Sequence, residues 1–308
     1  MIQLLDKLKG RFLTPGVSIG LDIGSSHIKL VALEKKGKEK ILKKVAAIPL
    51  TPGSDSAITI KNFMSSQGFS AGQVNISVSG PSVIMRYISF PQMNLSELKS
   101  TMQFEAKQYI PFALDEMFLD CAIVKEKVEN NKMLVVLAAI KKLIAQERIA
   151  LIERAGYSVK ALDVDCFCLA NTFMMSNQAL QDTLPQSIGL LNIGSRTTNM
   201  AIIESGSLRF SRDIAFGEQE TSLHNLAQEI NSSIDYYENQ SGKPVDKIFT
   251  SGGAMVNEAA LNFLTHQLTI PLELLNVFSR VQIDASLLPD ELKAKASLYA
   301  IALGLALR

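Results

Sequence analysis

The spacing of apolar residues divides the chain into short strands and helices that alternate along its length. Alternating or continuous apolar runs predict strands over 17–23, 27–34 and 41–48, separated by short polar turns. Three consecutive strands joined in this way favour an antiparallel meander. A helical stretch over 56–67 and a strand over 74–79 follow, so the chain opens as a mixed α/β unit.

A second unit starts after Gly80. Asn94 followed by Glu97 is a capping-box signature, and we expect the helix that begins there to end before Pro111. The predicted elements of this unit are strands over 83–90, 117–124 and 133–139 and helices over 94–109 and 141–154. We therefore predict a small α+β subdomain, 81–155, inserted into the first half of the chain.

The second half of the chain repeats the first in outline. Its predicted elements are strands over 188–193, 199–204, 207–214 and 247–250, and helices around 223–237, 254–267 and 294–307. A strand over 159–164 and a helix over 167–177 precede it and complete the first half, with a boundary at Pro185. The predicted organisation is an N-terminal amphipathic segment, 1–14, a first lobe from 15–80 and 156–185, the inserted subdomain, and a second lobe, 186–308. The predicted fold class is therefore α/β with two lobes.

The most informative feature is a repeat at two of the turns between strands. Leu21-Asp-Ile-Gly-Ser25 recurs as Leu191-Asn-Ile-Gly-Ser195. Turns of glycine and serine expose backbone N–H groups that can converge on an anion, so two facing turns would hold a di- or triphosphate. Asp22 could hold a magnesium ion through water, and Lys29 could reach phosphate oxygens. Each turn taken alone is equally well explained as a tight turn that needs small residues.

Two further features bear on phosphate chemistry. Gly252 and Gly253 precede a predicted helix, where free N–H groups and the helix dipole favour anions. A reaction on phosphate would also need a carboxylate to orient the attacking oxygen, and Asp163 is a candidate at the end of its strand. Asp165 is the other candidate, but its place at a predicted helix start is better explained as an N-cap.

Composition and charge narrow the class of protein. The 308 residues are 47% hydrophobic and 20% charged, which suits about two globular domains. The net charge of +1 gives no case for a general nucleic-acid binder. Residues 1–44 carry ten Lys or Arg against four Asp or Glu. The segment 1–14 has apolar residues at helical spacing, so it could form a helix that meets a membrane surface or a partner, and a short helix packed on its own protein or a frayed end explains it equally well. We interpret the three cysteines as buried reduced thiols and expect neither a signal peptide nor a membrane span.

Three segments resemble the phosphate 1, phosphate 2 and adenosine motifs of the actin-like (ribonuclease H-like) ATPase superfamily. They are Gly20-Leu-Asp-Ile-Gly-Ser-Ser-His-Ile-Lys29, Leu191-Asn-Ile-Gly-Ser-Arg-Thr-Thr198 and Ser251-Gly-Gly-Ala254. More specifically, the chain resembles the FtsA-like PilM family of type IV pilus assembly proteins. This resemblance rests on Phe104-Glu-Ala-Lys-Gln-Tyr-Ile-Pro-Phe112, Leu119-Asp120 and Ala302-Leu-Gly-Leu-Ala-Leu-Arg308.

The resemblance implies an actin-like fold that binds ATP or ADP with magnesium, with Asp22 as the residue that holds the metal. The implied nucleotide-binding residues are Asp22, Gly24, Ser25, Ser26, Lys29, Asn192, Gly194, Ser195, Arg196, Thr197, Gly252 and Gly253. It also implies a cytoplasmic protein, peripheral at the inner membrane through its partners. Those partners are the N-terminal cytoplasmic tail of a membrane-spanning PilN-like protein, other pilus assembly components and further copies of the chain.

The implied groove for the partner tail lies between the first lobe and the inserted subdomain. We place it near Phe104, Tyr109, Ile110 and Phe112. The alternative for each of these residues is packing within the subdomain's own helix.

Two departures from the superfamily pattern favour a scaffold over an enzyme. Asn192 replaces the aspartate expected in phosphate 2, and an amide supplies no negative charge to hold a cation or orient a water. Only 58 residues separate Ile193 from Gly252, which predicts a reduced or missing second subdomain in lobe 2 and weakened or lost nucleotide binding. The alternatives are an active ATPase or phosphotransferase, a filament-forming protein, and a cytoplasmic module of type II secretion.

Overall fold

The structure, a computed structural model, describes residues 16–37, 39–177, 187–215, 220–284, 287 and 295–308. The predicted amphipathic segment, 1–14, lies outside the described residues. Within the described part of the chain, no helix is both long and apolar enough to cross a membrane.

The first lobe is built on a mixed six-stranded sheet in the order β14-β3-β2-β1-β4-β8. Strands β1, β2 and β3 form the predicted antiparallel meander, and β4 and β8 extend the sheet beyond β1 in parallel. The strands are β1 (Val17–Ile23), β2 (His27–Lys36), β3 (Glu39–Pro49), β4 (Gln73–Val78), β8 (Ser158–Val164) and β14 (Gln282–Ile283). Helices α1 (Ser56–Ser66) and α3 (Lys142–Arg154) share one apolar core with this sheet.

The second lobe has the same topology, with a five-stranded sheet in the order β11-β10-β9-β12-β13. Its strands are β9 (Ser187–Ile193), β10 (Thr197–Glu204), β11 (Ser207–Ala215), β12 (Lys247–Ser251) and β13 (Leu272–Leu274). Again a three-stranded antiparallel meander is followed by two parallel strands on the other side of its first strand. Helices α5 (Glu220–Ser241) and α6 (Glu258–Gln267) cover the outer face. The repeat seen in the sequence is therefore a repeat of whole sheets, and the α/β fold with two lobes is confirmed.

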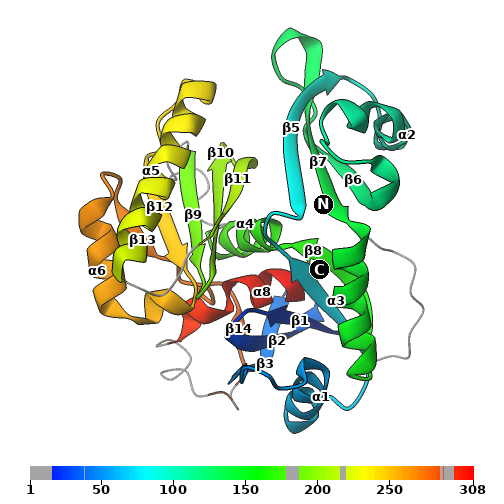
Figure 1. The fold of residues 1–308 in the computed structure, drawn as a ribbon, viewed down its shortest axis with the longest axis vertical. Coiled ribbons are helices and arrows are strands. Elements are labelled where there is room, and N and C mark those ends of the chain that lie inside the picture. The colour runs from blue at the N-terminus through cyan, green and yellow to red at the C-terminus, as the bar shows by residue number, and fades with distance from the viewer. Residues whose placement is uncertain (1–15, 38, 178–186, 216–219, 285–286, 288–294) are drawn as a thin grey trace.

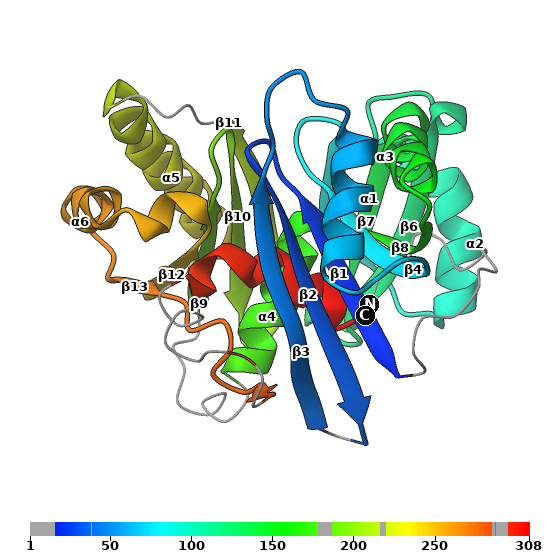
Figure 2. The ribbon, with the colours of Figure 1, turned by 90° about the horizontal axis from the view of Figure 1, so that it is seen from below.

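Two helices lie between the lobes (Figure 2). Helices α4 (Asp165–Ser176) and α8 (Ala300–Ala306) pack against one another and form a single core with residues from both sheets. Helix α8 approaches both α4 and β1 closely because a glycine faces backbone at each contact. A Cβ on Gly304 would lie 2.0 Å from the carbonyl oxygen of Cys168 in α4, and one on Gly20 of β1 would lie 2.0 Å from that of Ala302 in α8. Helix α8 consists of Ala, Ile, Leu and Gly alone, so all of its faces can be buried. Each of its residues is buried where the two lobes meet.

The inserted subdomain forms a third sheet with its own core, as predicted (Figure 1). Its antiparallel strands run in the order β5-β7-β6, and α2 packs on them. The elements are β5 (Val83–Pro91), α2 (Leu95–Glu105), β6 (Met117–Lys125) and β7 (Lys132–Lys141). The capping box is present: Asn94 and Glu97 each accept a hydrogen bond from the other's backbone N–H. The predicted helix to Tyr109 ends earlier, because its last turn tightens into a 3-10 helix over Ala106–Gln108.

Three elements near the C-terminus differ from the prediction. The last helix is a 3-10 turn, Ala296–Tyr299, followed by α8, and residues 288–294 lie outside the description. The short strands β13 and β14 were missed, since neither has enough residues for a periodic pattern. Both β14 and α8 come from the range 186–308, yet β14 pairs with β3 and α8 packs on β1, so the chain returns to the first lobe before it ends.

Candidate functional site

A cavity of about 770 Å³ lies where the two repeated turns meet, between the lobes. This volume is typical of small-molecule sites. All the predicted nucleotide-binding residues except Arg196 and Gly252 line it: Asp22, Gly24, Ser25, Ser26, Lys29, Asn192, Gly194, Ser195, Thr197 and Gly253. The structure thus brings together residues from both copies of the repeat.

The two turns have the same geometry and touch each other. The N–H of Gly24 donates to the carbonyl of His27, and the N–H of Gly194 donates to that of Thr197, each at 3.0 Å. The hydroxyl oxygens of Ser25 and Ser195 lie 2.8 Å apart, so the turns meet at their tips. A Cβ on Gly194 would lie 2.8 Å from the Thr197 oxygen, which explains why glycine stands there.

The strand register places equivalent polar pairs beside the two turns. Asp22 pairs with Lys29 across β1 and β2, and Asn192 pairs with Asn199 across β9 and β10. In the first copy the Lys29 ammonium lies 2.9 Å from the Asp22 carboxylate. In the second copy the Asn192 amide donates to the Asn199 oxygen at 3.1 Å. One side of the cavity therefore carries an ion pair and the other carries neutral amides.

Asp165 also lines the cavity, and its interpretation as a helix N-cap is wrong. It is the first residue inside α4, Val164 holds the cap position, and no side chain caps the helix. The Asp165 carboxylate instead interacts with the hydroxyls of Ser77 and Ser79, which sequence reasoning missed. Burial, together with the negative charge of Asp22, raises the pKa of Asp165 to about 6.

Replacing Asp165 with asparagine should stabilise the nucleotide-free and metal-free protein above neutral pH. A raised pKa means that the folded state holds the proton more tightly than the unfolded chain, so stability falls as the pH rises from about 4 to about 6. We expect Asp165→Asn to exceed the wild type by at most about 3 kcal/mol at pH 7.5 and to match it at pH 4. Thermal unfolding at both values measures this, with Asp235→Asn on the exposed side of α5 as the control. A difference that is equal at both pH values would contradict it.

Asp163 lies away from the cavity. Its carboxylate is 2% exposed and forms an ion pair with the guanidinium of Arg308, which is 5% exposed. A carboxylate enclosed in this way cannot reach a phosphate in the cavity. Asp163 instead joins the end of β8 to Arg308, which follows α8.

The two glycines of the third motif have different places. Gly253 lines the cavity, whereas Gly252 has φ +101° and a Cβ there would lie 2.4 Å from the Ile193 carbonyl oxygen. The helix that follows is a 3-10 turn over Gly253–Val256, and α6 begins only after Asn257, whose side chain caps it. A helix therefore starts at the glycine pair as expected, but it is a 3-10 turn, and the α-helix begins only at the stronger N-cap, Asn257.

Further lining residues come from segments that carry no recognisable motif. Arg148 reaches the cavity from α3 and donates to the carbonyl of Ile23 at 3.3 Å. Leu223 of α5 and Ala260 of α6 form part of an apolar wall at the other side. The described residues of the short interval between Ile193 and Gly252 thus still contribute to the lining.

The cavity fits a nucleotide. Lys29 and Arg148 supply positive charge beside turns that have no room for side chains at their glycines, and the apolar wall suits a base. In such a complex Asp22 would hold the metal through water, and the Ser25 and Ser195 turns would face the phosphates from both sides.

The residues predicted for the partner groove are not equivalent. The Phe104 side chain is 80% exposed on α2 and that of Phe112 is 38% exposed, with the Lys141 ammonium 4.5 Å from its ring centre. Ile110 is 4% exposed and lies in the subdomain's core, with Tyr109 packed at its edge. Ile110 therefore packs within its own subdomain, Tyr109 is half-buried, and Phe104 and Phe112 are exposed to a partner.

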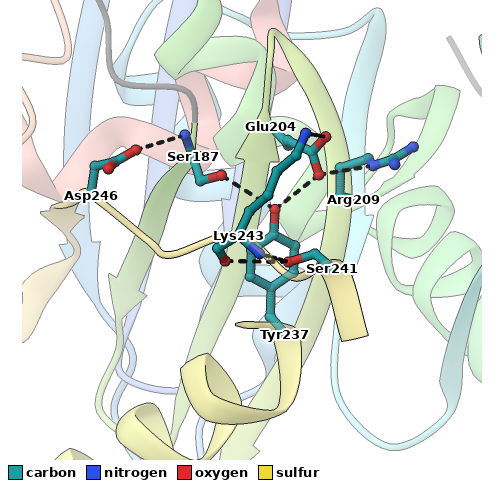
Figure 3. Close-up of polar contacts among 7 residues, drawn as sticks. All are labelled: Ser187, Glu204, Arg209, Tyr237, Ser241, Lys243 and Asp246. Carbon is teal, nitrogen blue, oxygen red and sulfur yellow. Dashed lines mark hydrogen bonds and ion pairs between the residues drawn. The ribbon is translucent and has the colours of Figure 1, made fainter. Parts of the chain in front are cut away.

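A second polar cluster lies at the opposite end of β10 from the cavity (Figure 3). The Glu204 carboxylate accepts from the Lys243 ammonium at 2.7 Å and from the Tyr237 hydroxyl at 3.0 Å, and Arg209 lies 3.4 Å away. Burial alone would raise the pKa of Glu204, but these partners outweigh it and hold the pKa below its usual value. Since the charges of the cluster are paired, it anchors the end of α5 to the sheet.

Comparison with known proteins shows the family and the fold of the chain. A sequence model described as type IV pilus assembly protein PilM matches residues 20–224 and 220–308. A solved PilM-PilN type IV pilus biogenesis complex is 24% identical with a TM-score of 0.82, over 94% of this chain and 98% of that one. The ethanolamine utilization protein EutJ from Carboxydothermus hydrogenoformans is 12% identical with a TM-score of 0.53, over 96% of this chain and 90% of that one. The fold is therefore actin-like, and the chain belongs to the PilM family of type IV pilus assembly proteins.

Proposed function

We propose that this chain is a scaffold of type IV pilus assembly that captures the cytoplasmic N-terminal tail of a PilN-like membrane protein, and that nucleotide in the cavity adjusts this binding. The observation that carries the proposal is the family match, which extends from residue 20 to residue 308. The similar solved structure is a complex with PilN, which supports the same kind of partner here. The protein would then lie in the cytoplasm beneath the inner membrane and be held there by its partner.

Contacts at the edge of the inserted subdomain support a binding surface near Phe112. The Lys141 ammonium lies over its ring, and the Lys142 ammonium donates to the carbonyl of Asp115 at 2.6 Å. Both lysines belong to the junction where β7 continues into α3, and α3 packs in the core of the first lobe. An exposed aromatic ring beside two cations at such a junction suits a peptide that carries apolar and acidic groups.

The position of the cavity supports regulation of peptide binding by nucleotide. Helix α3 carries Arg148 in the cavity lining and begins at the junction beside Phe112. A ligand that contacts Arg148 therefore acts on the same rigid element that borders the partner surface, and any coupling between the two sites must be reciprocal.

Calorimetric titration of the full chain with a synthetic PilN-tail peptide, with and without Mg-ATP, tests the proposal. We expect binding of one peptide per chain and a change in its affinity when Mg-ATP is present. A separate titration with Mg-ATP alone measures nucleotide binding directly. Absence of peptide binding under both conditions would rule out the scaffold role as stated here.

Phe112→Ala should weaken peptide binding about tenfold, because it removes the exposed aromatic side chain at the junction. Ile58→Ala is the matched control, since Ile58 is also exposed, at 58%, but lies on α1 outside the inserted subdomain. Phe104→Ala reports whether the outer face of α2 takes part. Equal affinities of the Phe112 and Ile58 variants would move the binding surface away from Phe112.

A further inference from the structure

A chain of side-chain hydrogen bonds crosses the sheet of the second lobe and ends on the first. Ser251 donates to Asn192 at 3.3 Å, Asn192 donates to Asn199 at 3.1 Å, and Asn199 donates to Asp213 at 2.8 Å. The four residues stand on the neighbouring strands β12, β9, β10 and β11. The other oxygen of Asp213 accepts a hydrogen bond from the backbone N–H of Gly80. The chain of bonds thus joins the cavity wall to the point where the polypeptide enters the inserted subdomain.

The carboxylate of Asp213 decides the direction of the two amide bonds in this chain. An ionised carboxylate only accepts, so Asn199 must turn its amide nitrogen toward Asp213 and its oxygen toward Asn192. Asn192 must then present its own nitrogen to Asn199, which leaves its oxygen for the Ser251 hydroxyl. Residue 192 therefore has to donate toward Asn199, which an amide can do and an ionised carboxylate cannot. Its oxygen shares the Ser251 hydroxyl with the carbonyl of Leu191, which lies 3.2 Å from that hydroxyl.

In the first copy of the repeat, the residues equivalent to Asn192 and Asn199 have different partners. There the equivalent pair is Asp22 and Lys29, which satisfy each other as an ion pair, and the neighbour of Lys29 on β3 is Ala47. In the second copy the carboxylate stands two strands further out, at Asp213 on β11, and two neutral amides occupy the positions beside the turn. The departure at Asn192 thus has a structural cause within this chain.

We propose that Asp213 is the positioning residue of the second cavity turn: it requires the amide at 192 and, through Gly80, holds the lobes together at the root of the inserted subdomain. Asn192 lines the cavity and is the last residue of β9 that pairs with β12, opposite Ser251. The hydrogen-bond direction set at Asp213 therefore decides which side-chain atoms of Asn192 face the cavity and which face Asn199. Asn199 is 2% exposed. If a substitution removes one of its hydrogen-bond partners, its amide group therefore stays buried without a replacement partner from bulk water.

Reversing the direction of the chain of bonds tests the proposal. Asn192→Asp places an acceptor against the Asn199 oxygen, and we expect a melting temperature about 5 °C below that of the wild type. Adding Asp213→Asn should restore it to within about 1 °C. In that double variant, residue 213 accepts from Gly80 and donates to Asn199, which turns its nitrogen to the new carboxylate at 192.

The control is Asn192→Asp combined with Asp235→Asn, which has the same net charge but removes an exposed carboxylate on α5. Restoration by Asp213→Asn and none by Asp235→Asn supports the proposal. Equal melting temperatures of the two double variants, or an unchanged melting temperature for Asn192→Asp alone, overturns it.

Hydrogen exchange at Gly80 supplies an independent measurement. Asp213→Ala removes the acceptor of its N–H, and we expect exchange of that amide to accelerate about tenfold while exchange in the core of β1 is unchanged. Equal exchange at Gly80 in the wild type and in Asp213→Ala overturns the link between the lobes. Neither measurement needs a nucleotide or a partner, so failure here is distinguishable from failure of the proposed function.

Discussion

Replacing Gly304 with alanine should lower the free energy of unfolding by about 3 kcal/mol or more, because there is no space for a methyl group between α8 and α4. A Cβ at this position would lie 2.0 Å from the carbonyl oxygen of Cys168 and 2.6 Å from its Cα. These are backbone atoms of α4, so no change of rotamer can relieve the contact.

The surroundings of α8 prevent the helix from moving aside. On its other side, Gly20 of β1 would place a Cβ 2.6 Å from the backbone nitrogen of Ala306, so this contact also is backbone against backbone. Leu303 and Leu305 are fully buried between the lobes, and any shift of the helix would open a cavity around them. The added methyl group would therefore separate α4 from α8 and loosen the contact between the two lobes.

Denaturant unfolding of Gly304→Ala beside Gly253→Ala measures this effect. A Cβ at Gly253 would meet its nearest atom, on Leu298, at the ordinary distance of 3.5 Å, so we expect that control to change stability by about 0.5 kcal/mol or less. Similar losses in the two variants would show that the close approach of α4 and α8 does not limit the stability of the fold.

Asp163→Asn should cost about 3 to 5 kcal/mol, because it leaves the buried guanidinium of Arg308 without a counter-charge. Both side chains are almost fully enclosed, at 2% and 5% exposed. Burial raises the pKa of Asp163 even though Arg308 and the N–H of Val164 act in the opposite direction. The free-energy cost of removing water from the Asp163 carboxylate thus exceeds the stabilisation that its partners supply. The loss of stability in Asp163→Asn therefore comes mainly from the Arg308 guanidinium, which stays buried without a counter-charge.

The double variant Asp163→Asn with Arg308→Met separates these contributions. Since it removes both charges, we expect it to be more stable than Asp163→Asn alone by about 1 to 3 kcal/mol. Chemical denaturation of the two single variants and the double variant gives the coupling energy. A fully stable Asp163→Asn protein that had lost phosphate release from ATP would instead indicate that Asp163 acts on a substrate.

The local patterns of the sequence were sufficient for most of the fold. Period-two runs predicted the meander of each lobe, and the capping box of Asn94 and Glu97 correctly marked the start of α2. Such features depend on neighbours within about four residues, so they can be interpreted along the chain. The repeat at Leu21 and Leu191 predicted two equivalent turns, and the contact between Ser25 and Ser195 shows that the fold brings them together.

The sequence failed where the outcome depended on packing between distant segments. Asp163 and Asp165 are two residues apart, and only the packing of α8 decides that the first faces Arg308 and the second faces the cavity. Arg148 and Ser77 carry no motif, because their role arises from the helix and the strand that bring them to the same cavity.

By itself, then, the sequence determined the elements, the repeat and the small residues at the turns, because helix and strand periods and glycine geometry are local properties. Only the tertiary structure decided what stands beside each turn. Asn192 looked like the loss of an aspartate, but contact with Asn199 and Asp213 makes an amide necessary there. The physical reason is that hydrogen-bond direction is set by the partners that folding brings together, and the decisive partner stands two strands away.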